Sequence, residues 1–345
     1  MVAGVLVAWL ACLASPGLPP GDTLRVRVSE RPVWGLDPTL VEEIRIGALE
    51  GDERYTFGLV AGVAVSPDGT IWVSDRVLGT LRRYSPEGVH LGAVGRKGKG
   101  PGEFEYLMDV RMLPDGAVAV WDPLNTRIHI FEQDGRFRED LFVPVRGMYG
   151  IHEDFEVDTA GHYYAIAAEV GPGGPASFKA YWLKLSREGV LLDTVRMVPS
   201  GRRGREHPVV TQTAVSPMGY LVHGRTDAYA FQYALRTGSW VLLERDVDPE
   251  AYARDERAEA QRFEDLFAER NGEEPRRIPE RKPAWASLHV DVEGRFWVRR
   301  YTDGVRVEER DADRQTREKF GNPPRTWGSL SCTTCSTREG PSSAP

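Results

Sequence analysis

The stretch GVAVSPDGTIWVSDRVLGTLRRYSPEGVHLGAVG (Gly62–Gly95) decides the fold, because DVRMLPDGAVAVWDPLNTRIHIFEQDGRFREDLFV (Asp109–Val143) repeats its pattern. Each copy reads as a strand, an Asp-Gly turn, a strand that ends in Asp, a loop, a strand, an acidic turn that ends in Gly, and a final strand. Tight hairpin turns require positive φ, which glycine adopts without steric cost. Each copy therefore predicts a four-stranded antiparallel sheet.

The turn glycines recur at a fixed spacing along the chain. Two turn positions lie 19 residues apart in four copies, at Gly69 and Gly88, Gly116 and Gly135, Gly219 and Gly238, and Gly294 and Asp313. A further copy, with Gly161 and Gly189 28 residues apart, holds an insertion around GPGGP (Gly171–Pro175). The first three copies follow one another at 47 and 45 residues, which is typical of propeller blades. The sequence therefore predicts an all-β protein, a β-propeller of four-stranded antiparallel blades.

The predicted propeller extends from residue 22 to residue 320. Leu24–Val28 and Leu40–Ile46 read as strands, and we expect the second of them to pair with the last blade and close the ring. Five repeats and these strands imply six blades, the sixth of them incomplete. Residues 321–345 lack strand alternation and are predicted to be a disordered tail, from a chain whose C-terminal end is truncated or frame-shifted.

One segment of the chain has a helical pattern. Pro249–Asn271 is rich in helix formers, with Asp248 in front of it as a cap and Gly272 after its end. It interrupts the repeats, so we expect a helical insertion outside the ring, lying across one face where it could cover the mouth of the channel.

Residues 1–21 read as a signal peptide or a disordered N-terminus. Val2–Ala14 is an apolar run of 13 residues, which is too short for a transmembrane helix but has the length of a signal-peptide core. We therefore expect a secreted or periplasmic protein without a membrane span. Cys12 follows Trp-Leu-Ala, which only loosely resembles a lipoprotein box, so a lipid anchor is the less favoured alternative.

Cys332 and Cys335 form a C-x-x-C pair, a spacing found in redox pairs and in half-sites for zinc. The surrounding sequence is rich in Ser, Thr and Pro, and it holds no second pair and no histidine nearby. This context favours a tail that merely carries two cysteines.

The loop Gly95–Phe104 (GRKGKGPGEF) and the second copy, with Asp122, Asn125 and Arg127, carry a family resemblance. They resemble NHL-repeat propellers and the related six-bladed bacterial propellers of the TolB-like type, most closely over Gly58–Phe142. The resemblance implies six blades. It also implies that Asp122, Asn125 and Arg127 brace the loop between the second and third strands. Asp75 stands at the position of Asp122 in the first copy, which a structural role predicts and a single active site does not.

Four residues are candidates for contacting a ligand in the central channel: Glu105, His152, Asp154 and His289. His152 and Asp154 lie two apart at the start of an expected innermost strand, so they share a face if the chain is extended there. In propeller enzymes similar to this chain, carboxylates, Asn or His from several innermost strands hold a divalent metal over the channel. No spacing in this sequence compels the four residues to converge.

Two functions remain open, of which the sequence favours the first. One is a binding or scaffolding propeller for a protein, peptide or glycan, because G-x-S-x-G, H-E-x-x-H and EF-hand motifs are absent. The other is a metal-dependent hydrolase or lyase, similar to propeller lactonases or NHL-type peptide-amidating lyases. The net charge of −7 argues against nucleic acid as a partner. We expect a monomer without a cofactor, unless a divalent metal such as Ca²⁺ binds.

Overall fold

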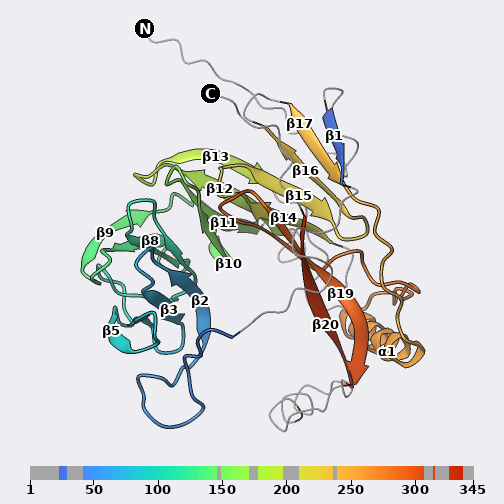
Figure 1. Cartoon of the computed structure of the whole chain (residues 1–345), viewed down its shortest axis with the longest axis horizontal. Coiled ribbons are helices and arrows are strands. Elements are labelled where there is room, and N and C mark those ends of the chain that lie inside the picture. Colours follow the sequence, from blue (N-terminus) through green and yellow to red (C-terminus); the bar gives the residue numbers. More distant parts are fainter. Residues whose placement is uncertain are drawn as a thin grey trace.

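The computed structural model describes residues 23–28, 42–145, 149–170, 178–196, 210–235, 239–306, 314 and 326–336. Residues 149–154, 170, 178 and 328–336 are described by their backbone alone. Within these ranges the chain forms five β-sheets and one long helix, α1 (Arg254–Asn271), as Figure 1 shows. The prediction of a nearly all-β protein is therefore confirmed.

Four sheets are antiparallel and keep their strands in chain order. The first holds β2 (Val60–Val65), β3 (Ile71–Asp75), β4 (Thr80–Tyr84) and β5 (His90–Val94). The second holds β6 (Val110–Met112), β7 (Val118–Asp122), β8 (Arg127–Phe131) and β9 (Phe137–Phe142). The third holds β10 (Tyr149–Val157), β11 (Tyr163–Val170), β12 (Phe178–Leu185) and β13 (Leu191–Arg196). The fourth holds β14 (Thr211–Val215), β15 (Leu221–Arg225), β16 (Ala230–Ala234) and β17 (Trp240–Glu244).

The fifth sheet has three described strands, β18 (Ser287–Val290), β19 (Phe296–Arg306) and β20 (Trp327–Ser336). One further strand, β1 (Thr23–Arg27), pairs in parallel with β17 and extends the fourth sheet at its outer edge. The predicted strand near the N-terminus therefore exists, although its partner was not foreseen.

The same hairpin joins the first two strands of every sheet. At each turn a glycine with φ between 76° and 88° donates its amide hydrogen to the carbonyl three residues before it. These glycines are Gly69, Gly116, Gly161, Gly219 and Gly294. Gly88, Gly135 and Gly189 make the same bond in the next hairpin of the first three sheets. The regular spacing of glycines in the sequence therefore marks equivalent turns, as predicted.

The sheets follow one another around a common centre (Figure 1). The first strands of neighbouring sheets contact each other, as β2 does β6, β6 does β10, and β14 does β18. A hydrophobic cluster lies between each consecutive pair of sheets, with Trp72 in the first, Trp121 in the second, Trp182 in the third and Trp285 in the fourth. This arrangement is consistent with a β-propeller. The described ranges supply five sheets, so the sixth blade stays a prediction.

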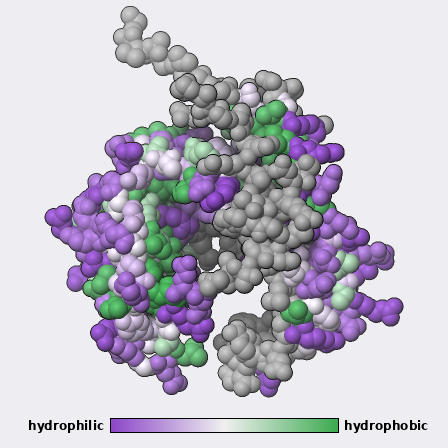
Figure 2. Space-filling model, viewed as in Figure 1, coloured by the Kyte–Doolittle hydropathy of each residue, from purple (hydrophilic) through white to green (hydrophobic). Residues whose placement is uncertain are grey.

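The segment 42–58 covers the outer part of the first sheet. Ile44 and Ile46 lie close to Gly88, and the hydroxyl of Tyr84 donates a hydrogen bond to the carbonyl of Arg54 at 2.7 Å. The prediction that Leu40–Ile46 is a strand closing the ring is wrong for its described part, because residues 42–46 pair with no strand. On the left of the view in Figure 2, hydrophobic residues lie toward the inside of the molecule and most residues at its outer edge are hydrophilic.

The helix lies at the periphery beside β19 and β20 (Figure 1), outside the ring as predicted and not over its centre. It begins later than predicted, with Ala253 as its N-cap in place of Asp248. The backbone amide of Ala253 donates to the carboxylate of Glu256 at 3.2 Å. The helix ends at Gly272, which has a φ of 64°, as predicted. Among the described residues no helix combines the length and hydropathy needed to cross a membrane.

The prediction of a disordered tail is wrong for residues 327–336. They form β20, which pairs with β19 along its whole length. The carboxylate of Glu259 on α1 accepts hydrogen bonds from the amides of Thr326 (2.9 Å) and Trp327 (3.1 Å). A segment rich in Ser and Thr lacks the apolar alternation that reveals a strand. Here the partner strand and the helix impose the extended backbone.

Candidate functional site

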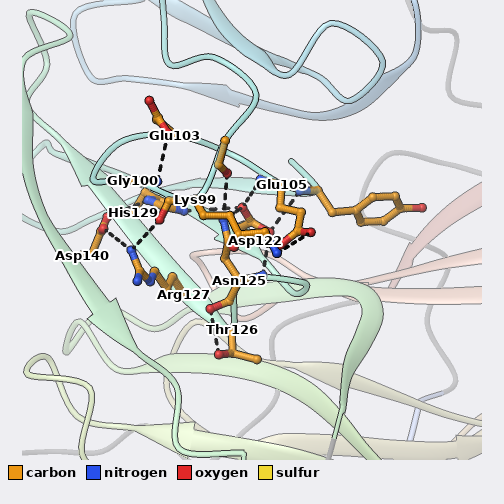
Figure 3. A network of polar contacts seen from close by, with 12 residues as sticks. Lys99, Gly100, Glu103, Glu105, Asp122, Asn125, Thr126, Arg127, His129 and Asp140 are labelled. Carbon is orange, nitrogen blue, oxygen red and sulfur yellow. Dashed lines mark hydrogen bonds and ion pairs between the residues drawn. The ribbon is translucent and has the colours of Figure 1, made fainter.

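Asp122 fastens the loop that enters the second sheet (Figure 3). Its Oδ2 accepts a hydrogen bond from the amide of Glu105 at 2.7 Å, and its Oδ1 accepts one from the amide of Tyr106 at 3.1 Å. The amide (3.2 Å) and side-chain Nδ2 (2.9 Å) of Asn125 donate to the same carboxylate. These bonds confirm that Asp122 and Asn125 brace a loop.

The first sheet repeats this arrangement 47 residues earlier. Asp75 accepts hydrogen bonds from the amides of Gly58 (2.9 Å), Leu59 (3.2 Å) and Leu78 (3.1 Å). These three positions plus 47 are 105, 106 and 125, the donors to Asp122 in the second sheet. A contact set that is copied with the repeat belongs to the fold, so we assign both aspartates a structural role.

His129 extends the Asp122 network below the surface. Its Nδ1 lies 2.6 Å from Asp140 Oδ1 and its Nε2 lies 3.6 Å from Asp122 Oδ2. Arg127 pairs with the other oxygen of Asp140 at 3.1 Å. Burial acts to raise the pKa of Asp122, but hydrogen bonds from His129 and from backbone amides outweigh it, so the pKa lies below its ordinary 3.8. The side chains of Asp122 and His129 are fully buried, whereas those of Arg127 and Asp140 are 32% and 16% exposed. The centre of this network therefore does not face solvent.

A different group of charges lies where the first strands of three sheets meet. Arg111 on β6 donates from Nε and Nη2 to the two carboxylate oxygens of Glu156 on β10, at 2.8 and 3.0 Å. Its Nη1 donates to Asp109 Oδ1 at 2.5 Å. Gly62 on β2 abuts Asp109 so closely that an added Cβ would clash with its carboxylate. We call Asp109, Arg111 and Glu156 the inner-edge cluster.

Burial decides the protonation of the inner-edge cluster. It raises the pKa of Asp109 to about 6, against the opposing effect of Arg111. Burial also acts to lower the pKa of Arg111, but the hydrogen bonds and charges of Glu156 and Asp109 outweigh it and raise that pKa. A carboxyl group that is poised near neutrality at a site open to solvent is a mark of functional sites. The side chains of Arg111 and Glu156 are 29% and 28% exposed, whereas that of Asp109 is 12% exposed, so solvent reaches the cluster mainly at Arg111 and Glu156.

The raised pKa sets how Asp109 affects stability with pH. The folded state binds this proton more tightly than the unfolded chain, whose ordinary pKa is 3.8. The ionised carboxylate therefore costs folding free energy as the pH rises through about 6, and this cost is absent below about 4. Ionisation of Asp109 at neutral pH therefore does not favour folding.

The inner-edge cluster was not predicted from the sequence. Asp109, directly before β6, and Arg111 on β6 are two residues apart at the start of an innermost strand. The same spacing drew attention to His152 and Asp154. Arg111 and Glu156 are 45 residues apart, and only the packing of β6 beside β10 brings them together. The pair Asp109 and Arg111 could therefore be noticed in the sequence, whereas the contact of Arg111 with Glu156 could not.

The structure separates two of the predicted site residues. The carboxylate of Glu105 pairs with Lys99 at 3.1 Å, in the loop before β6 (Figure 3). His289 lies on β18 in the fifth sheet, opposite Trp297 on β19. Within the described ranges no hydrogen bond or ion pair connects Glu105 with His289.

The other two predicted residues, His152 and Asp154, lie on β10, and only their backbone is described. The register between β10 and β11 shifts between Gly150 and Phe155, so this stretch is not a regular strand. The prediction that His152 and Asp154 contact a ligand therefore stays a prediction. In the described part of the chain, no three His, Cys, Asp or Glu residues are grouped so that they could hold a metal ion.

The C-x-x-C pair lies on β20. Cys335 is opposite Trp297 and Cys332 is opposite Arg300 in the ladder with β19. Residues three apart on an extended strand lie on opposite faces with Cα atoms about 10 Å apart, beyond the reach of a disulfide. The backbone therefore disfavours a disulfide between these cysteines.

No protein-family model and no curated protein sequence matches this chain. Similar solved structures include virginiamycin B lyase from Staphylococcus aureus, with a TM-score of 0.34 and 10% identity over 69% of this chain and 62% of the lyase. This chain thus spans less than two thirds of the lyase. A protein from Bacteroides fragilis that is described as exported has a TM-score of 0.45 and 11% identity, over 85% of this chain and 78% of that one. A gluconolactonase from Xanthomonas campestris has a TM-score of 0.37 and 15% identity, over 69% of this chain and 68% of that one. These values are too low to assign an activity.

Proposed function

We propose that this chain is a secreted or periplasmic binding propeller that receives a cationic group of a protein or peptide ligand at the inner-edge cluster. The observation that carries the proposal is a buried carboxyl group, Asp109, which is held beside Arg111 and Glu156 at the inner edge of consecutive sheets. Its location outside the cytoplasm rests on the apolar run Val2–Ala14.

The charges of the inner-edge cluster favour a cation. Two carboxylates face one guanidinium, so the cluster carries a net charge of −1 when both acids are ionised. Both oxygens of Glu156 and the Oδ1 of Asp109 accept hydrogen bonds from Arg111. The Oδ2 of Asp109 accepts none from the described residues, and Asp109 is only 8% exposed. An ammonium or guanidinium group would satisfy this oxygen by a charge-assisted hydrogen bond, whereas a neutral glycan would not offset its charge.

Calorimetry with two matched peptides tests this proposal. The first is a blocked glycine pentapeptide with a central lysine, and the second carries norleucine, which lacks the ammonium group. We expect the lysine peptide to bind at pH 8 and to bind roughly tenfold more weakly at pH 5, because Asp109 is then protonated. Asp109→Asn should weaken binding at pH 8 by a similar factor, because it removes the charge. Asp134→Asn, at an exposed turn of the same sheet, is the control.

Two results would refute the proposal. Equal heats from the lysine and norleucine peptides would show that no charge is recognised. Undiminished binding of the lysine peptide to Asp109→Asn would show that the cation is held elsewhere.

A metal-dependent hydrolase or lyase is the second candidate, because a carboxyl pKa of about 6 suits a general acid or base. His152 and Asp154 stay candidate metal ligands under this proposal. Calorimetry with Ca²⁺ and with Zn²⁺ tests it. Tight stoichiometric binding that is lost in His152→Ala would support the enzyme, and the absence of heat with both ions would reject it.

A further inference from the structure

A cavity of about 600 Å³ lies between α1 and residues 276–280, which run back along the helix and are called here the returning segment. These residues are far from the inner-edge cluster in the sequence. Arg254 and Arg257 line it from the helix, and Arg277 and Glu280 line it from the returning segment. Its volume is within the range of small-molecule sites. We call it the helix groove.

Side chains of α1 hold the returning segment in place. Arg257 donates from Nε and Nη2 to the carbonyl of Ile278, at 3.0 and 2.8 Å. The side-chain carbonyl of Gln261 accepts a hydrogen bond from the amide of Ile278 at 2.8 Å, and Glu264 accepts one from the amide of Arg276 at 3.1 Å. The walls of the helix groove are therefore fixed relative to each other.

The floor of the helix groove is apolar. Tyr252 and Ile278, which are 9% and 7% exposed, pack with Ala260 in a small hydrophobic cluster of their own. Tyr252 and Ile278 also line the cavity. A ligand could therefore bury an aromatic or aliphatic group against this floor while its polar part meets the charged walls.

The charge of the helix groove is opposite to that of the protein. Three guanidinium groups and one carboxylate line it, a net charge of +2, whereas the chain carries −7. The side chains of Arg254 and Arg277 make no hydrogen bond or ion pair with any described residue. Glu280 is 85% exposed and pairs with Arg257 at 3.9 Å, so it offsets one of the three positive charges. Two free guanidinium groups thus flank an apolar floor.

We propose that the helix groove binds a small amphiphilic anion, with a phosphate or carboxylate held by Arg254 and Arg277 and an apolar group on Tyr252 and Ile278. The planar guanidinium fork matches both anions in a bidentate geometry. This site is independent of the inner-edge cluster and of the ligand proposed for it.

Phenyl phosphate, inorganic phosphate and benzyl alcohol are the probes, titrated calorimetrically into the full chain at about 0.15 M salt, where long-range attraction is screened. Phenyl phosphate should bind with one-to-one stoichiometry. Inorganic phosphate should bind more weakly, because it lacks the ring, and benzyl alcohol should not bind. The double variant Arg254→Gln/Arg277→Gln should weaken phenyl phosphate binding at least tenfold. Since neither side chain makes a hydrogen bond or an ion pair with a described residue, we expect the variant to fold.

Arg262→Gln is the matched control, because Arg262 is also exposed on α1 but does not line the helix groove. Undiminished binding to the double variant would overturn the proposal. An equal loss in Arg262→Gln would overturn it as well, since it would reveal attraction to the helix as a whole. Asp109→Asn should bind phenyl phosphate as the native chain does, so this test fails or succeeds separately from that of the inner-edge cluster.

Discussion

Replacing Lys282 with methionine is expected to destabilise the protein by about 3–5 kcal/mol, the cost of leaving a buried charge without its partner. The Nζ of Lys282 lies 2.7 Å from the carboxylate of Glu256 and donates to the carbonyl of Thr302 at 2.7 Å. The side chains of Lys282 and Glu256 are 0% and 5% exposed. The ion pair and the hydrogen bond to Thr302 together connect α1 to β19 through a buried Lys282. Urea unfolding measures the change in the free energy of unfolding.

The adjacent Arg281 provides a matched control. It pairs with Asp248 at 2.9 Å, but the two side chains are 53% and 81% exposed. Arg281→Met should therefore cost no more than about 1 kcal/mol. Adding Glu256→Met to Lys282→Met should recover much of the loss, since an apolar pair avoids the desolvation of both charges. A loss below about 1 kcal/mol in Lys282→Met would mean that the helix is not anchored by this pair.

Replacing Asp122 with alanine is expected to cost about 3 kcal/mol or more, because it leaves the amides of Glu105, Tyr106 and Asn125 without their acceptor. Asp75→Ala should cost a similar amount, since Asp75 accepts from the equivalent amides of the first sheet. Hydrogen exchange at the amides of Glu105 and Tyr106 should accelerate in Asp122→Ala but not in Asp75→Ala.

Asp134→Ala serves as the control for this pair. Asp134 is exposed in a hairpin turn, and among the described residues only the amide of Arg136 donates a hydrogen bond to it. It should change stability by about 1 kcal/mol or less. A large loss in Asp122→Ala together with no loss in Asp75→Ala would contradict the equivalence of the two repeats. It would also reopen a functional role for Asp122.

The sheets could be predicted because their information is local. A hairpin turn that needs positive φ favours Gly at a fixed position. Gly69, Gly116 and Gly161 recur at such positions in the sequence, and all three have positive φ in the structure. The structural role of the aspartates that brace the loops could be predicted for the same reason, because Asp75 and Asp122 occupy equivalent positions in the two repeats. A feature that depends on one turn or one repeat can be predicted without knowledge of the tertiary structure.

The elements that were predicted wrongly depend on distant partners. Residues 327–336 become β20 only because β19 and Glu259 bind them. Residues 42–46 pair with no strand, and Ile44 and Ile46 pack instead against Gly88 of the first sheet. The inner-edge cluster likewise needs β6 and β10 side by side before Glu156 meets Arg111.

The titration of the Asp109 carboxyl group, followed by carbon chemical shifts with and without the lysine peptide, tests the central claim that the inner-edge cluster is the binding site. We predict a pKa of about 6 for Asp109 in the free protein. The bound ammonium group should lower it toward the ordinary 3.8, because a nearby cation favours the carboxylate. A pKa near 3.8 in the free protein, or one that the peptide leaves unchanged, would contradict the claim.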